Sequence, residues 1–102
     1  MSKYISAQEH KDLTRTAQAI LLPLILLANK DNEINKKAFI KKIDWISDYR
    51  TWDKYWKELE DKGILVRLNK QTWMVSPHEC YSDGACHSTL INKWNEVANA
   101  AH

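Results

Sequence analysis

The residues of this chain most able to do chemistry are basic, and they occur in three groups. The first group recurs at helical spacing within residues 48–62 and consists of Arg50, Lys54 and Lys57. The second group precedes it and consists of Lys36, Lys37, Lys41 and Lys42. The third group follows it and consists of Arg67 and Lys70, with the neutral polar Gln71 beside them. Ammonium and guanidinium groups bind phosphates, and arginine also bonds a guanine edge with two parallel hydrogen bonds. Double-stranded DNA is therefore the ligand that these residues favour.

The segment that carries the first group is predicted to be an amphipathic helix. Its apolar residues recur every three or four positions and predict one buried face, made of Tyr49, Trp52, Trp56 and Leu59. The basic residues fall on a different side. Lys62 and Gly63 predict its end, because glycine adopts a left-handed conformation freely and lysine complements the negative end of the helix dipole.

Two short runs of β-type residues follow this helix directly. Residues 64–68 and 72–75 are rich in β-branched and aromatic side chains, and Asn69-Lys70-Gln71 between them predicts a tight hairpin tip. Helix, glycine and small hairpin is the order of the second half of a winged helix-turn-helix.

The preceding residues supply the other half of that pattern. Residues 33–35 predict a short edge strand that pairs with the hairpin, and Asn35 is a good N-cap. Residues 36–43 predict a short amphipathic helix with an apolar face of Phe39, Ile40 and Ile43. Residues 44–47 form the turn to the next helix: Trp45 or Ile46 fills the core, and Ser47 or Asp48 caps the helix.

The two ends of the chain are predicted to be mainly helical. Residues 1–6 carry no pattern, and a broad apolar face predicts a helix over 7–28, with either a kink at Pro23 or a break just before it. A last helix runs from Ser88 or Thr89 to about Asn99, with an apolar face of Leu90, Ile91, Trp94, Val97 and Ala98. Residues 1–102 therefore form a single winged-helix domain, mainly α with a small β-hairpin (α+β). Its core covers about 7–76, and a C-terminal helical extension covers about 88–99.

Composition fits one ordinary globular domain. The chain has 102 residues, 44% of them hydrophobic, and a net charge of +2, which is too small to identify a partner. The longest apolar run, residues 19–28, is about half of the roughly 20 residues needed to cross a bilayer, so we expect no membrane partner. Charged residues interrupt the N-terminus where a signal peptide would be apolar, which favours a cytoplasmic protein with free thiols.

Four residues near the C-terminal third are of zinc-binding types: His78, Cys80, Cys86 and His87. Zinc sites present tight pairs such as C-x2-C, and adjacent residues such as Cys86 and His87 rarely point at one ion. We therefore expect no metal site, although the spacing also permits a disulfide. The chain has no phosphate loop or nucleophile elbow, and its two glycines cannot build a phosphate cradle. We expect neither an enzyme, nor a cofactor, nor a small-molecule substrate.

The tryptophans are predicted to be core residues first. Trp45, Trp52, Trp56 and Trp94 all fall on apolar faces. Trp73, in the second hairpin strand, either packs on Trp94 or is exposed for a partner.

Part of the chain resembles a known family. Residues 56–65 (WKELEDKGIL) resemble the end of the recognition helix and the first wing strand of many bacterial winged-helix regulators. Met74-Val75-Ser76-Pro77, then Gly84 and residues 90–95 (LINKWN), are similar to the tail of plasmid replication and maintenance proteins of the RepL type from Gram-positive bacteria. The resemblance covers about residues 34–95 and implies a winged-helix fold that binds double-stranded DNA.

In that fold the helix over 48–62 enters the major groove and the helix before it crosses the phosphate backbone. Arg50 is the first candidate for a base contact. The full set of candidate DNA-binding residues is Lys36, Lys37, Tyr49, Arg50, Thr51, Lys54, Lys57, Arg67, Lys70 and Gln71. The basic residues of this helix equally fit a solvated outer face without a ligand.

The expected function is sequence-specific DNA binding in plasmid or phage replication, in copy control, or in transcription regulation. The last helix, or the one over 7–28, has apolar surface for a homodimer. A second hypothesis is a protein-interaction module, in which the face bearing tryptophan and aspartate binds a host polymerase or another replication or transcription protein.

Overall fold

A three-stranded antiparallel sheet joins segments from both halves of the chain. The computed structural model describes residues 3–6, 10–44, 46, 48–82 and 84–100. The strands lie in the order β2-β4-β3, with bounds β2 Glu33–Asn35, β4 Thr72–Val75 and β3 Leu65–Arg67. Ile34 lies opposite Trp73, and Val66 lies opposite Met74. The predicted hairpin and the predicted edge strand that pairs with it are both confirmed.

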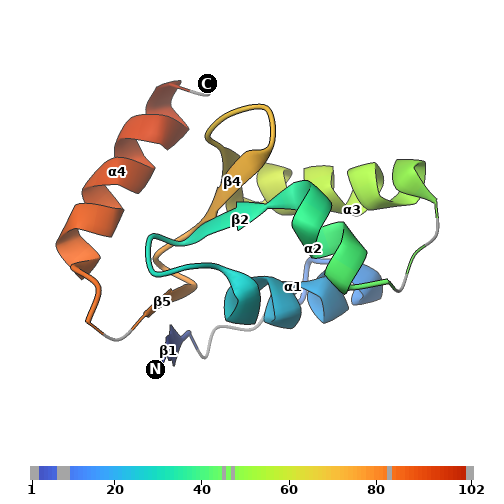
Figure 1. Ribbon diagram of the computed structural model, residues 1–102, viewed down its shortest axis with the longest axis horizontal. Coiled ribbons are helices and arrows are strands. Elements are labelled where there is room, and N and C mark those ends of the chain that lie inside the picture. Colours follow the sequence, from blue (N-terminus) through green and yellow to red (C-terminus); the bar gives the residue numbers. More distant parts are fainter. Residues whose placement is uncertain (1–2, 7–9, 45, 47, 83, 101–102) are drawn as a thin grey trace.

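Helices cover both faces of this sheet, which gives a compact α+β fold. The helices of the described residues are α1 Arg15–Leu27, α2 Lys36–Lys42, α3 Tyr49–Asp61 and α4 His87–Ala100. Figure 1 shows α4 on one side of the hairpin and the other three helices on the opposite side. Strand β4 serves both sides, because successive side chains alternate: Trp73 and Val75 join the core under α1, α2 and α3, while Met74 packs with Trp94 of α4.

Local capping explains where the central helices begin and end. Asn35 Oδ1 accepts a hydrogen bond from Ala38 N at 3.0 Å, and Asp48 Oδ1 accepts one from Arg50 N at 3.0 Å. Helix α3 ends at Asp61, and Gly63 follows it with φ +75°. These boundaries match the sequence prediction, in which Asn35, Asp48 and Gly63 carried the signals.

Helix α1 begins later than predicted. Residues 7–9 lie outside the described part of the chain, but residues 10–14 form a turn and the helix starts at Arg15. Thr14 is the N-cap, and its backbone N and its Oγ1 both donate to the Glu58 carboxylate of α3, at 2.7 and 2.9 Å. This contact with α3 anchors the start of α1, and local helix propensity does not reveal it. The helix continues through Pro23, so of the two predicted alternatives, a kink or a break, the break is wrong.

A second, two-stranded sheet was not predicted. Strand β1 (Lys3–Ile5) pairs antiparallel with β5 (Cys80–Ser82), although residues 1–6 carry no pattern. Lys3 Nζ also donates to the carbonyls of Ile25 and Ala28, at 2.6 and 2.7 Å. It therefore satisfies the C-terminal end of α1, where carbonyls lack helical partners.

Two aromatic predictions are wrong. Tyr49 is 58% exposed, whereas Trp52, Trp56 and Leu59 are buried as predicted. Phe39 packs against both Trp52 and Trp56 and fills the core beneath that part of α3. Tyr49, in the first turn of the helix, lies outside this packed region. Trp73 is neither exposed nor packed on Trp94: it is buried with its ring edge-to-face on Trp56, 5.6 Å between ring centroids.

Two further predictions concern the turn and the membrane. Trp45 and Ser47 lie outside the described residues, while Ile46 packs against the core and its carbonyl accepts from Trp52 Nε1 at 2.9 Å. None of the helices in the described ranges is long and apolar enough to cross a bilayer.

Candidate functional site

A groove between α2, α3 and the β3-β4 hairpin brings many of the predicted site residues together. Its volume is about 490 Å³. Ile40, Trp56 and Trp73 supply apolar surface to it. Its charged lining residues are Lys36, Lys37, Asp53, Lys57, Glu60, Asp61, Arg67 and Lys70. We call this hollow the hairpin groove.

Two predicted DNA contacts in the hairpin groove are already engaged within the protein. Lys36 Nζ lies 2.5 Å from Asp53 Oδ1, and 5.6 and 5.5 Å from the ring centroids of Trp56 and Trp73. The Arg67 guanidinium lies 5.1 Å from the Trp73 ring and donates to the carbonyls of Asn69 and Lys70. Lys36 is therefore held inside the groove, and Arg67 braces the hairpin tip.

Other predicted residues present free polar groups. The hairpin groove is also lined by Lys37, Lys57, Lys70 and Gln71. Within the described residues, none of these three lysines forms a salt bridge. A second hollow of about 470 Å³ adjoins it and is lined by Asn35, Lys37, Ala38, Lys41 and Tyr49. Lys37 and the exposed Tyr49 line both hollows, so they stand on the ridge between them.

The basic residues of α3 divide between two surfaces. Lys57 lines the hairpin groove, whereas Arg50 and Lys54 are exposed outside it. The Lys54 ammonium lies over the Tyr55 ring at 5.7 Å. Thr51 is half-buried, and its backbone N–H bonds the Asp48 carbonyl.

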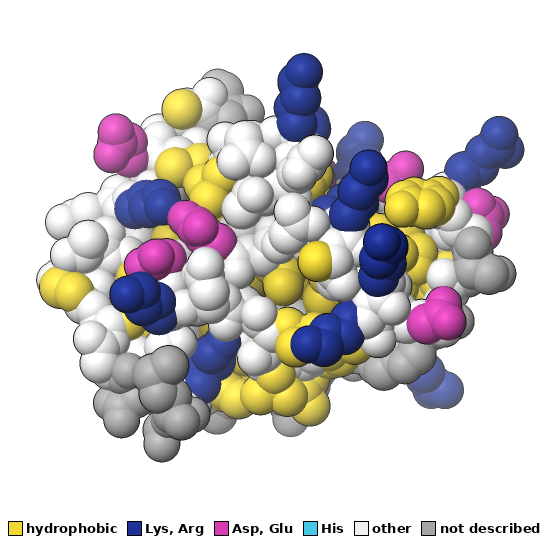
Figure 2. Space-filling view, in the orientation of Figure 1, with side chains coloured by type: hydrophobic (Ala, Val, Ile, Leu, Met, Phe, Trp, Pro, Cys, Tyr) yellow, Lys and Arg dark blue, Asp and Glu magenta, His cyan; other side chains and the backbone are white. Residues whose placement is uncertain are grey.

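Acidic side chains limit the positive charge of this surface. Asp53, Glu60 and Asp61 line the hairpin groove beside its cations. Figure 2 shows Lys and Arg side chains over α2 on the face that it draws, with Asp and Glu at the same end of the molecule. Sequence reasoning did not pair Asp53 with Lys36. A signal was present, because Asp53, Trp56 and Glu60 recur at helical spacing and share one side of α3.

The four residues of zinc-binding types do not converge. Cys80 is buried, and burial raises the pKa of its thiol to about 11. Cys86 is exposed at the start of α4, where hydrogen bonds with Ser88 and Thr89 lower its pKa to about 7. His87 Nε2 lies 3.2 Å from the Pro77 carbonyl oxygen, and His78 is exposed. Among the described residues no three His, Cys, Asp or Glu side chains gather around one point.

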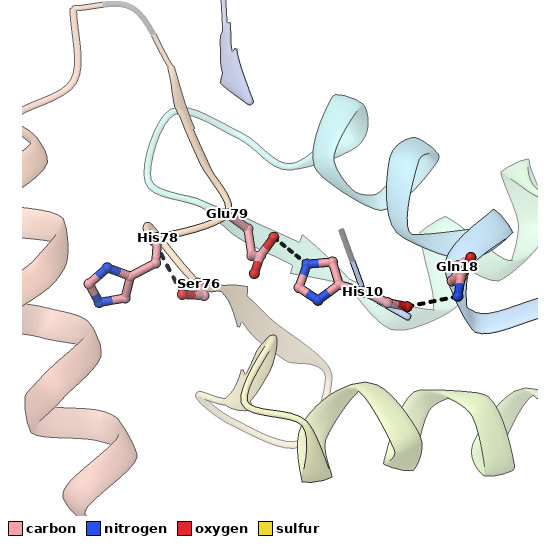
Figure 3. A network of polar contacts seen from close by, with 5 residues as sticks. All are labelled: His10, Gln18, Ser76, His78 and Glu79. Atoms are coloured by element: carbon pink, nitrogen blue, oxygen red, sulfur yellow. Dashed lines mark hydrogen bonds and ion pairs between the residues drawn. The ribbon is translucent and has the colours of Figure 1, made fainter. Parts of the chain in front are cut away.

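A polar network missed by the sequence analysis lies away from the hairpin groove. His10 Nε2 lies 2.8 Å from Glu79 Oε2, and both side chains are nearly buried. Figure 3 shows Glu79 pointing toward His10 while the neighbouring His78 points toward α4. Gln18 donates to the His10 carbonyl at 2.7 Å. The network ties the turn before α1 to the turn after β4, and residues this far apart in sequence give no local signal.

Comparisons with known proteins add no family. The chain matches no protein-family model, and it has no significant match among curated proteins or among solved structures. The candidate site therefore rests on its own geometry.

Proposed function

We propose that this chain is a winged helix-turn-helix protein that binds double-stranded DNA. The observation that carries the proposal is the order of elements: α1, β2, two helices joined by a short turn, and a hairpin whose second strand lies between β2 and β3. In winged-helix proteins this order sets the second helix of the pair and the hairpin side by side, as DNA-contacting elements.

The charged side chains support a docking mode on this surface. Lys37 and Lys41 of α2 and Lys70 at the hairpin tip contact phosphates, which gives affinity that does not depend on sequence. Arg50 and Lys54 on α3 reach the base edges, where arginine reads guanine. Further contacts to phosphates or to base edges come from neighbouring residues, which are Tyr49, Thr51, Lys57 and Gln71. Lys36 and Arg67 contribute less, because they are engaged within the protein.

The biological setting follows from the resemblance of residues 34–95 to RepL-type proteins. We infer a cytoplasmic role in plasmid or phage replication, in copy control, or in transcription regulation. A homodimer through α4 or α1 would place two α3 helices on two half-sites, which supplies the specificity that one small domain lacks.

A second candidate function is a protein-interaction module. The observation that favours it is the hairpin groove itself, in which buried Trp56 and Trp73 adjoin Asp53, Glu60 and Asp61. Aromatic residues often anchor protein interfaces. A host polymerase or another replication or transcription protein would then be the partner.

Salt dependence of binding separates the two functions. Fluorescence anisotropy of labelled random-sequence duplex is measured with the wild-type protein at about 50 and about 200 mM salt, a range over which roughly six or more phosphate contacts lose about 10³-fold affinity. The variants Lys37→Ala and Lys57→Ala should each weaken binding and reduce the slope of log K against log salt by about 0.9.

The matched control is Lys30→Ala. Lys30 is an exposed lysine in the turn between α1 and β2, which Figure 1 places near α4 and away from α3. We expect its binding curve to match that of the wild type. Absence of binding at low salt by the folded protein would overturn the DNA proposal, and a protein partner bound equally well at both salt concentrations would favour the second function.

A further inference from the structure

Lys36 differs from the other cations of the hairpin groove. Its ammonium is paired with Asp53, its side chain is 20% exposed, and two indole rings lie within 5.6 Å of it. Within the described residues, no other ion pair joins charged side chains of this groove. The protein therefore neutralises one particular lysine in a groove that leaves Lys37, Lys57 and Lys70 unpaired.

We propose that Asp53 is a specificity-determining residue, which holds Lys36 away from DNA phosphates and so lowers affinity for non-specific sequence. The inference rests on the proposed function. A phosphate that enters the hairpin groove competes with the Asp53 carboxylate for the same ammonium. Lys36 changes partner only when the neighbouring contacts hold a phosphate close enough to replace that carboxylate.

The discrimination follows from how well a DNA site fits. On a well-fitting site, Lys37, Lys57 and Lys70 together position the backbone, and Lys36 adds its contact. On a poorly fitting site the phosphate lies farther away, so Lys36 stays with Asp53. Specificity is a ratio of affinities, and a lower affinity for non-specific DNA raises that ratio without any new contact to a base.

The position of Asp53 argues against a purely structural role. Its side chain is 62% exposed at the rim of the groove, whereas Lys36 lies deeper over the tryptophans. Ion pairs with such an exposed partner contribute little to folding stability. The two indole rings already hold the Lys36 side chain in place, so the carboxylate is not needed to bury it.

A double-mutant cycle on random-sequence duplex tests the proposal. The proteins are wild type, Asp53→Asn, Lys36→Met and the double variant, measured by anisotropy across a salt series. Asp53→Asn should raise affinity by roughly one-and-a-half- to fivefold, the range expected for release of an exposed ion pair. It should also steepen the salt slope by about 0.9, which corresponds to one more phosphate contact. When Lys36 is methionine, both effects should fall to the small change expected from removing one negative charge from the groove.

The matched control is Asp61→Asn, alone and with Lys36→Met. Asp61 lines the same groove and carries the same charge but has no ion pair with Lys36, so its removal changes only the general field. We expect its effect to be the same in both backgrounds. Equal and additive effects of Asp53→Asn and Asp61→Asn, with wild-type binding intact, would overturn this inference alone. If neither the wild type nor any variant binds duplex at low salt, the proposed function fails and this inference fails with it.

Discussion

The two faces of the three-stranded sheet are built very differently. On one face a large cluster joins α1, α2, α3 and the inner side of β4, with Trp52, Trp56 and Leu59 fully buried. On the other face a small cluster holds α4 through Val66, Met74, Leu90 and Trp94. Strand β4 contributes to both faces, through Trp73 and Val75 on the first and Met74 on the second.

The difference separates the candidate site from the C-terminal helix. The large cluster fixes α3 against α2 and the hairpin, so it determines the shape of the hairpin groove. Helix α4 contacts the sheet from the opposite side and supplies no residue to that groove. We therefore expect damage to the large cluster to abolish both folding and binding, and damage to the small one to spare binding.

Trp56→Ala should cause the largest loss of stability. Trp56 is 2% exposed and contacts the rings of Phe39 and Trp73, so truncation leaves a large cavity and removes part of the groove floor. We expect a loss of about 3–5 kcal/mol in the free energy of unfolding. Urea denaturation followed by circular dichroism measures it. Trp56→Phe, which keeps a ring, should lose less than half as much, and a similar loss in both variants would contradict the packing argument.

Asn32→Ala tests a polar member of the same face. Asn32 is fully buried with φ +61°, and its Nδ2 donates to the carbonyls of Val75 and Cys80, at 3.1 and 2.7 Å. Alanine loses both bonds and fits that backbone poorly, so we expect a loss of about 2–3 kcal/mol in urea denaturation. Asn32→Gly keeps the backbone conformation and should recover about 1 kcal/mol of it. If glycine is no better than alanine, backbone strain plays no part.

Trp94→Ala tests the α4 face. Trp94 is 8% exposed and borders a surface hollow of about 330 Å³, so water can fill part of the space left behind. We expect a loss of about 2 kcal/mol, below the usual cost of removing a large buried aromatic. Limited proteolysis should show faster cleavage of α4, while duplex binding stays within twofold of wild type. A variant that loses DNA binding while still folded would show that the two faces are coupled.

The two cysteines give the smallest expected effect and report on the two faces separately. Cys80 belongs to the large cluster, where burial raises its pKa to about 11, and exposed Cys86 at the start of α4 has its pKa lowered to about 7. Because the thiolate is the nucleophile, iodoacetamide should modify Cys86 at a rate that is half-maximal near pH 7 and levels off roughly one to two pH units above it. Cys80 should react only on unfolding. Mass spectrometry assigns the site, and early modification of Cys80 in the native protein would contradict its burial.

Local signals account for most of what could be predicted. Asn35 and Asp48 cap helices through their own side chains, and Gly63 ends α3 through its own backbone, so each position is readable from a few neighbouring residues. The hairpin was readable for the same reason, because Asn69 Oδ1 accepts from the backbone of Gln71 and Thr72 within the tip.

What escaped prediction depends on partners distant in the sequence. The start of α1 is set by Glu58, and the engagement of Lys36 by Asp53 needs α2 and α3 to be packed first. Neither predicted alternative for Trp73, packing on Trp94 or exposure, is right, since alternation along β4 gives direction only once the strand's register and neighbours are known. Charge and spacing predicted the candidate DNA-binding residues. They did not predict that Lys36 and Arg67 are engaged within the protein while the other lysines of the groove have no ion pair within the described residues.

The pairing of β1 with β5 has a consequence for the order of folding. It joins residues 3–5 to residues 80–82, so it closes a loop that contains most of the chain. The entropy cost of closing a loop grows with its length, and contacts between distant segments form slowly. The hairpin and the helix pair can assemble from local contacts first. We therefore expect β1 to dock last, and Lys3 to complete the C-terminal end of α1 only after the rest of the domain has formed.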